Sequence, residues 1–268
     1  MRTDVQSFTL AHLLRRPAPV EVGGFVAGFD PSTTSPYVNY ATPRPGAEPT
    51  DADVAALIGA FRERGLKPRL EFAPDAAPAV EAVLRRAGFG TEAEHEYMVC
   101  TPVSLTMPAS PEMHAALAMP DAPGGPAGGG FRVETPFGDD EFRAVDAALS
   151  EAFDGEFPPS AEGAARLRRT QENGGAVRFV RAEDGGCAGA AMCSAPAAGT
   201  AELAGVGTRP AYRGRGIAAA VTASLAETLF TRGAESVWLE YSGEGSRRVY
   251  ERVGFRSRGA RLYLALES

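Results

Sequence analysis

The stretch "RPAYRGRGIAAAV", residues 209–221, places three arginines and two glycines just before an alanine-rich helix former. A glycine-rich turn that leads into a helix leaves several backbone N–H groups without intrahelical partners. These donors and the positive end of the helix dipole favour a phosphate group. Arg209, Arg213 and Arg215 add positive charge there, although the 268-residue chain has a net charge of −7. The stretch lacks the P-loop and dinucleotide-binding signatures. It nevertheless predicts a binding site for a polyphosphate, and the alternative is a solvated Arg–Gly turn.

The sequence around this stretch has the pattern of a mixed α/β unit. Apolar residues at helical spacing alternate with short apolar runs, and Asp184-Gly185-Gly186 has the composition of a hairpin turn. The predicted helices cover 139–153, 160–172, 217–232 and 245–255. The predicted strands cover 131–136, two runs within 176–195, 200–208, 236–242 and 260–266.

The first half of the chain repeats part of this order. "RLEF" (69–72) corresponds to "WLEY" (238–241), and "VLRRAGF" (83–89) corresponds to "VYERVGF" (249–255). The segments 23–30, 36–45 and 53–65 correspond in turn to the strand after the hairpin, the strand that ends at Arg209 and the long helix. Five matches in one order predict an internal duplication, with two unrelated α/β units as the alternative.

Composition limits the classes of function. A pI of about 5.2 argues against a nucleic-acid-binding protein. No apolar run is long enough to span a bilayer, and we expect a cytoplasmic protein without membrane partners. Three cysteines and three histidines without metal-ligand spacing predict no metal site, and the cysteines are expected in the core. The Pro/Gly-rich segment 119–130 reads as a linker.

The loop in its context resembles that of a known family. Residues Arg213, Gly214, Arg215, Gly216, Ile217 and Ala218 fit the pattern Arg/Gln-x-x-Gly-x-Gly/Ala. They follow a predicted strand, open a helix, and precede the segment "YERVGF" (250–255). In these features the sequence resembles the GCN5-related N-acetyltransferase (GNAT) superfamily. The resemblance implies that this loop binds the pyrophosphate of acetyl-CoA.

The resemblance covers residues 131–268 well and the first half weakly. It implies an α/β (α+β) fold with two GNAT-like mixed β-sheets flanked by helices, in a tandem arrangement whose N-terminal sheet is truncated and degenerate. The expected boundaries are a degenerate domain over 1–105, a linker over 106–130 and a catalytic domain over 131–268.

The resemblance also implies roles for residues outside the loop. Tyr250 occupies the position of the family's tyrosine acid, which protonates the leaving thiolate, with a packed structural tyrosine as the alternative. Glu202, on the strand before the loop, is the candidate general base, with a polar strand residue as the alternative; strand alternation is expected to place residues 202, 204, 206 and 208 on one face. Val206, Gly207 and Thr208 are expected to contact the pantetheine arm. Ser246 is expected to cap its helix or contact the cofactor, and Gly243 stands where the family often has an asparagine.

The first half is expected to bind no acetyl-CoA. After Arg44 it has "GAEPTDAD" (46–53), with acids where the loop would need arginines, and Leu84 stands at the position that corresponds to Tyr250. Its expected roles are to cover the open sheet edge of the second half and to shape the acceptor pocket.

The resemblance implies an acetyl-CoA-dependent N-acetyltransferase that acts on a primary amine of a small molecule or peptide by direct attack on the thioester. The alternative is a non-catalytic acyl-CoA-binding or regulatory module of the same fold. The sequence does not identify the amine. It also leaves open whether the donor acyl group is larger than acetyl and whether the protein forms a homodimer.

Overall fold

The computed structural model describes residues 5–108, 131–156 and 158–267. Most of the predicted linker 106–130 lies outside the described residues. The first half contains α1 (Val5–Leu14), β1 (Ala18–Val22), β2 (Phe25–Phe29), β3 (Tyr40–Pro43), α2 (Asp51–Arg62), β4 (Arg69–Phe72), α3 (Val80–Arg86) and β5 (Phe89–Cys100). The second contains β6 (Val133–Glu134), α5 (Asp139–Ala152), α6 (Ala161–Glu172), β7 (Ala176–Arg181), β8 (Cys187–Cys193), β9 (Thr200–Thr208), α7 (Ile217–Thr231), β10 (Ser236–Tyr241), α8 (Gly243–Val253) and β11 (Arg256–Leu266).

The predicted mixed α/β class is confirmed, but the two expected sheets are joined into one. Within the described residues the sheet has 11 strands, in the order β1-β2-β3-β4-β11-β5-β10-β9-β8-β7-β6. The β3–β4 and β9–β10 pairs are parallel and the other pairs are antiparallel. Outward from the central pair, β11 and β5, both sides show the same succession of pairings, and the second half adds one more antiparallel strand, β6, at its edge.

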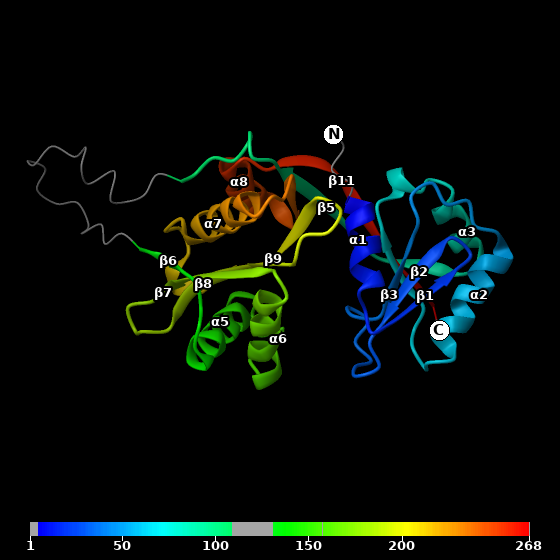
Figure 1. The fold of residues 1–268 in the computed structure, drawn as a ribbon, viewed down its shortest axis with the longest axis horizontal. Helices are drawn as coiled ribbons and strands as arrows, with labels where there is room; N and C mark the ends of the chain where they lie inside the picture. Colours follow the sequence, from blue (N-terminus) through cyan, green and yellow to red (C-terminus); the bar gives the residue numbers. More distant parts are fainter. Residues whose placement is uncertain (1–4, 109–130, 157, 268) are drawn as a thin grey trace, which may run out of the picture.

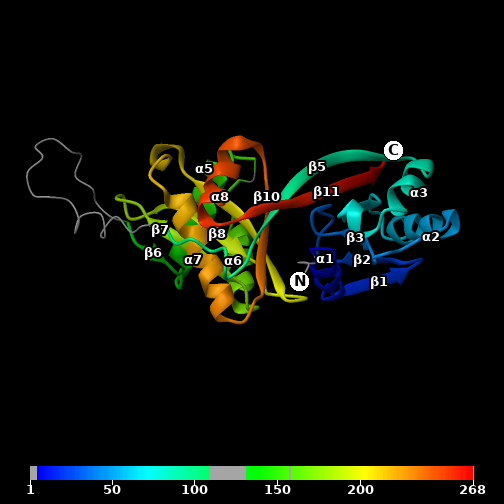
Figure 2. The ribbon, with the colours of Figure 1, turned by 90° about the horizontal axis from the view of Figure 1, so that it is seen from above.

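The two halves exchange their last strands. Strand β5 of the first half pairs with β10, and β11 of the second half pairs with β4. Gly90 and Arg256, the first residues after the two Gly–Phe pairs, pair with Ala265 and Val99 respectively, so the two strands are related by an approximate twofold axis. Figures 1 and 2 show β5 and β11 crossing side by side between the two halves.

Helices cover both faces of the sheet in the second half. Helix α7 packs on β7, β8 and β9, and α5 and α6 pack on these strands from the opposite side (Figure 1). Two apolar clusters fill the two interfaces, one centred on Val221, Leu225 and Leu229 of α7 and one on Phe142 and Val145 of α5. None of the described helices is long and apolar enough to cross a membrane.

Helix α1 and strands β1 and β5 were not predicted. The buried residues of α1 include the polar Gln6 and Thr9 together with Phe8, so its apolar residues do not follow a single helical stripe. Strand β5 carries Glu92, Glu94 and Glu96 along its exposed first part. A strand in which charged residues alternate with small ones has little hydrophobic signal, because its stability comes from the strands on both sides.

Candidate active site

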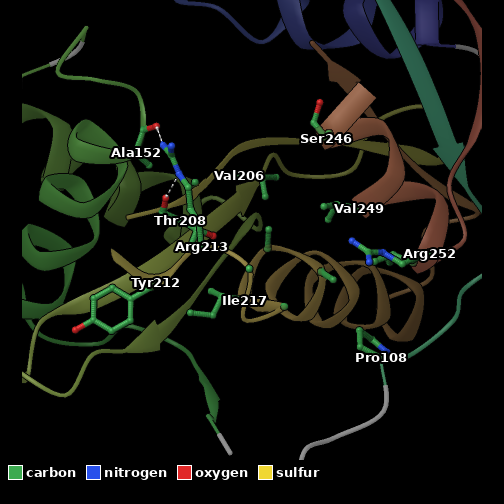
Figure 3. Close-up of a pocket in the computed structure, with 17 residues that line it drawn as sticks. Pro108, Ala152, Val206, Thr208, Tyr212, Arg213, Ile217, Ser246, Val249 and Arg252 are labelled. Atoms are coloured by element: carbon green, nitrogen blue, oxygen red, sulfur yellow. Dashed lines mark hydrogen bonds between the residues drawn. The ribbon is translucent and has the colours of Figure 1, made fainter. Parts of the chain in front are cut away.

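A cleft of about 780 Å³ lies between the end of β9, the start of α7 and helix α8. Figure 3 shows its labelled side chains arranged around the first turn of α7. The predicted residues that line it are Val206, Gly207, Thr208, Arg213, Gly214, Gly216, Ile217, Ala218 and Ser246. It is completed by residues that the sequence did not single out, namely Pro108, Ala152, Tyr212, Ala219, Gly245, Val249, Arg252 and Val253.

The glycines of the loop leave the first turn of α7 uncapped and accessible. Gly216 is the N-cap residue with φ +83°, and no side chain caps the helix. Gly214 has φ +79°, and a Cβ atom on either glycine would meet no atom within 4 Å. The first amides of α7 therefore point toward open space without intrahelical partners, which is the donor set that an anion requires.

The guanidinium groups of the three loop arginines have different contacts. Arg213 lines the cleft, but its guanidinium donates to the carbonyl oxygens of Thr208 at 3.3 Å and Ala152 at 3.1 Å (Figure 3). Arg209 forms ion pairs with Glu151 and Asp184. Arg215 is exposed and is not a lining residue of the cleft. The structure thus brings Arg213 to the cleft and leaves Arg209 and Arg215 outside it.

Strand β9 has one open edge beside the cleft. It pairs with β10 only from Thr200 to Glu202, whereas its pairing with β8 continues to Thr208. The backbone from 203 to 208 therefore has no β10 partner, and an extended ligand could pair with it as an added strand. The buried Oγ1 of Thr208 has no hydrogen-bond partner among the described residues. These unused polar groups fit the amide-containing arm of CoA.

A bulge in β9 separates Glu202 from the cleft-lining residues. Gly205 has φ +59°, and the β8–β9 register shifts between Ala190 and Met192. The extra residue reverses the alternation of faces, so Val206 packs against the α7 core, whereas Glu202 faces the opposite side of the sheet. The expectation that residues 202, 204, 206 and 208 share one face was therefore wrong.

Glu202 lies where β9 and β10 diverge. Its side chain is partly buried, and its carboxylate makes no hydrogen bond to any described residue. Burial raises the pKa of Glu202 to about 7; Arg261 opposes this shift, and the charges of Glu240 and Glu71 add to it. A carboxyl group with this pKa can accept a proton near neutral pH.

A buried ionic cluster faces Glu202 from three other strands. Arg261 of β11 donates to Glu240 of β10 at 2.8 Å and to Glu71 of β4 at 3.4 Å. The Tyr263 hydroxyl donates to Glu240 at 2.6 Å. Sequence reasoning did not single out this cluster, although a signal was available. Glu71 and Glu240 are the third residues of the repeated segments "RLEF" and "WLEY".

Tyr250 lies on α8 next to the cleft rather than in its lining. The side chain is 7% exposed and packs near Phe255, with 6.1 Å between the ring centroids. Its hydroxyl has no hydrogen-bond partner among the described residues. Burial raises the pKa of Tyr250 to about 12, so the phenol stays protonated at neutral pH and can act only as a proton donor.

Ser246 does not cap its helix. Its hydroxyl donates within the first turn of α8, to the carbonyl oxygens of Ser242 at 2.6 Å and Gly243 at 2.9 Å. Ser242 is the N-cap residue, and its side chain forms no cap hydrogen bond. Ser246 therefore remains a lining residue whose hydroxyl oxygen can still accept a hydrogen bond.

Cys100, Cys187 and Cys193 are buried, as predicted. Burial raises the pKa of Cys187 to about 12 and that of Cys193 to about 11, which keeps both thiols protonated at neutral pH. Among the described residues there is no group of three or more His, Cys, Asp or Glu side chains that could hold a metal ion.

Comparison with solved structures shows what the fold resembles. A GCN5-related N-acetyltransferase from Kribbella flavida has a TM-score of 0.76 at 22% identity, covering 98% of this chain and 95% of that one. An acetyltransferase of the GNAT family from Novosphingobium aromaticivorans has a TM-score of 0.55 at 22% identity, covering 98% and 96%. A tandem GNAT protein from the clavulanic acid biosynthesis pathway has a TM-score of 0.60 at 12% identity, covering 92% and 80%. At these identities the likeness concerns the fold.

The search of curated proteins found no match to the chain. The model of the Acetyltransferase (GNAT) family matches residues 142–255, from α5 through α8. This span contains the uncapped start of α7, the open edge of β9 and the helix that carries Tyr250. The likeness to the acetyltransferase (GNAT) family therefore rests on the segment 142–255, which matches the model of that family.

Proposed function

We propose that the protein is an acetyl-CoA-dependent N-acetyltransferase that acetylates a primary amine of a small molecule or peptide. The observation that carries this proposal is the joining, in one cleft, of an uncapped helix start with the open edge of β9. The first supplies donors for a diphosphate, and the second supplies backbone groups for an extended amide chain. A CoA thioester has these two parts in sequence.

Different residues of the chain would bind different parts of acetyl-CoA. The amides of Ile217 and Ala218, behind Gly214 and Gly216, would hold the diphosphate. The backbone of residues 206–208 would pair with the pantetheine arm. When bound, acetyl-CoA would supply an acetyl group activated as a thioester. Strands β9 and β10 separate after Glu202. The gap between them, called the fork below, would receive the thioester end of acetyl-CoA.

Two residues are proposed to move protons during direct transfer. Glu202 would accept a proton from the ammonium form of the acceptor, so that the neutral amine can attack. Tyr250 would donate its phenolic proton to the departing thiolate. The two residues approach the fork from opposite sides, since Glu202 faces away from α7 and Tyr250 belongs to the α7-side core. With the two residues on opposite sides, the amine would enter from one face of the sheet and the thiol would leave from the other.

The N-terminal half is proposed to be the degenerate member of a tandem GNAT pair. The order β2-β3-α2-β4-α3-β5 matches β8-β9-α7-β10-α8-β11. Helix α2, which corresponds to α7, is closed by a capping box in which Thr50 and Asp53 satisfy each other's backbone amides. Two N-terminal donors are thus already used and a carboxylate occupies the anion position, which supports the expectation that this half binds no acetyl-CoA.

This half would instead contribute to the acceptor side. It brings Glu71 to the cluster that faces Glu202, together with Glu240. The three carboxyl groups outnumber the two guanidinium groups beside them, Arg261 and the Arg69 that pairs with Glu71, which favours an acceptor that arrives as a cation.

The proposal is tested by thiol release from acetyl-CoA over a panel of primary amines, with wild type and Tyr250→Phe. We expect the variant to lose about a hundredfold or more in turnover, with an unchanged Kd for CoA by calorimetry. Tyr37→Phe, at an exposed tyrosine of the first half, is the control and should retain full turnover. Binding of CoA without turnover of any amine by wild type would instead support the non-catalytic module.

A further inference from the structure

A second hollow adjoins the cofactor cleft on the outer side of α8. It is an open depression of about 510 Å³ lined by Arg248, Glu251, Arg252 and Arg256. Arg252 also lines the cofactor cleft. In Figure 3 this arginine extends from α8 toward α7, on the opposite wall from Arg213. The two hollows therefore share one lining residue, Arg252.

The positive charge of this second hollow is not neutralised by the protein. Arg248 and Arg252 are exposed and make no hydrogen bond or ion pair with any described residue. Arg256 donates only to the backbone carbonyl oxygens of Glu251 and Phe255, at 2.9 Å and 2.8 Å. The carboxylate of Glu251 already accepts a hydrogen bond from Arg247 at 2.9 Å. Three guanidinium groups thus gather in a chain whose net charge is −7.

The cofactor cleft alone leaves one phosphate of CoA unaccounted for. Its amides at the start of α7 suit the diphosphate, and Arg213 is held by the carbonyl oxygens of Thr208 and Ala152. CoA carries a further phosphate on the 3′ position of its ribose. A terminal phosphate of this kind is bound best by guanidinium groups, which can donate two parallel hydrogen bonds.

We propose that Arg248, Arg252 and Arg256 form the binding site for the 3′-phosphate of CoA. This inference rests on the proposed function, since it requires the diphosphate at α7. It makes the outer face of α8 a specificity element that distinguishes CoA from ligands that share its pantetheine and diphosphate but lack the 3′-phosphate.

The test compares CoA with 3′-dephospho-CoA, which differs only in that phosphate, by titration calorimetry. Wild type should bind CoA about tenfold more tightly than dephospho-CoA, which corresponds to roughly 1.4 kcal/mol for an exposed charged contact. The double variant Arg248→Gln/Arg256→Gln, at the two arginines that line only the second hollow, should lose most of this preference and keep its affinity for dephospho-CoA. Arg258→Gln, at an exposed arginine of β11 that lines neither hollow, should retain the preference.

An equal loss of affinity for both ligands in the double variant would overturn the inference, because the arginines would then act on the diphosphate or through general charge. Equal binding of both ligands by wild type would also overturn it, while leaving the proposed function intact. If wild type bound neither ligand, the proposed function itself would fall, and the 3′-phosphate site with it.

Discussion

At the scale of single residues, Glu202 shows how the environment changes the chemistry of a side chain. A glutamate on a strand edge would ordinarily be ionised at neutral pH. Here burial raises its pKa from an ordinary value of 4.5 to about 7, and Glu240 and Glu71 add to the shift against Arg261. The residue therefore changes its charge in the pH range where the proposed reaction would operate.

This shift predicts a pH-dependent stability difference for Glu202→Gln. Because the folded-state pKa lies above the unfolded value, the folded protein holds the proton more tightly, and ionisation lowers wild-type stability as pH rises from about 4.5 through about 7. At pH 8 the variant should be more stable than wild type by on the order of 2 kcal/mol, and this advantage should vanish near pH 4. Denaturant unfolding at both pH values measures it. Glu227→Gln, at an exposed position of α7, is the control, and a pH-independent difference for Glu202→Gln would refute the prediction.

At the scale of elements, the turn from α8 to β11 holds the two halves together. Gly254 ends α8 with φ +105°. The chain that leaves β5 passes close to it, and the Thr106 amide donates to the Val253 carbonyl oxygen at 2.9 Å. A Cβ atom on Gly254 would lie 1.8 Å from the carbonyl oxygen of Ser104. The glycine is therefore required both by its backbone conformation and by this close approach.

We expect Gly254→Ala to lower the free energy of unfolding by about 3 kcal/mol or more, since strain and a backbone clash add together. The matched control is Gly59→Ala in α2, where the added methyl group meets no atom within 4 Å. It should raise stability by about 0.5–1 kcal/mol, because alanine restricts the unfolded chain and favours the helix. The shift in urea midpoint measures both. Similar effects of the two substitutions would contradict the role assigned to the turn.

At the scale of the whole molecule, the exchanged strands make the two halves one cooperative unit. Strand β5 pairs with both β10 and β11, and β11 pairs with both β4 and β5. Arg261 links the halves a second time, through Glu71 of one and Glu240 of the other. Neither half has a complete sheet without a strand from its neighbour.

Arg261→Met should therefore destabilise the whole molecule. The variant leaves the partly buried Glu240 without an ion-pair partner among the described residues and leaves Glu71 with Arg69 alone, which should cost about 3 kcal/mol. Both halves should unfold in one transition at a lower Tm, followed by calorimetry. Arg143→Met removes an exposed ion pair with Asp140 and should change stability by less than about 1 kcal/mol. Two separate transitions, with only one of them shifted by Arg261→Met, would show that the halves unfold independently.

The sequence by itself determined the parts that depend on local pattern. The predicted elements of the second half, from residues 139–153 to the strand ending at 266, match the observed ones apart from shifts at their ends. The glycine-rich start of α7 was predicted because a turn with positive φ angles before a helix has a distinct composition. The repeated order of segments was also visible, since each segment keeps its own length and apolar spacing.

Only the tertiary structure decided where these parts meet. The bulge at Gly205 turned Glu202 away from Val206. Glycines at 205 and 207 are compatible with a bulge, but the sequence does not show where the faces of the strand reverse. The exchange of β5 and β11, the cluster around Arg261 and the placement of Arg252 on both hollows all depend on segments that are distant in the chain. Local periodicity reports which side of an element is buried, whereas the neighbour that buries it is chosen by pairing and packing across the whole fold.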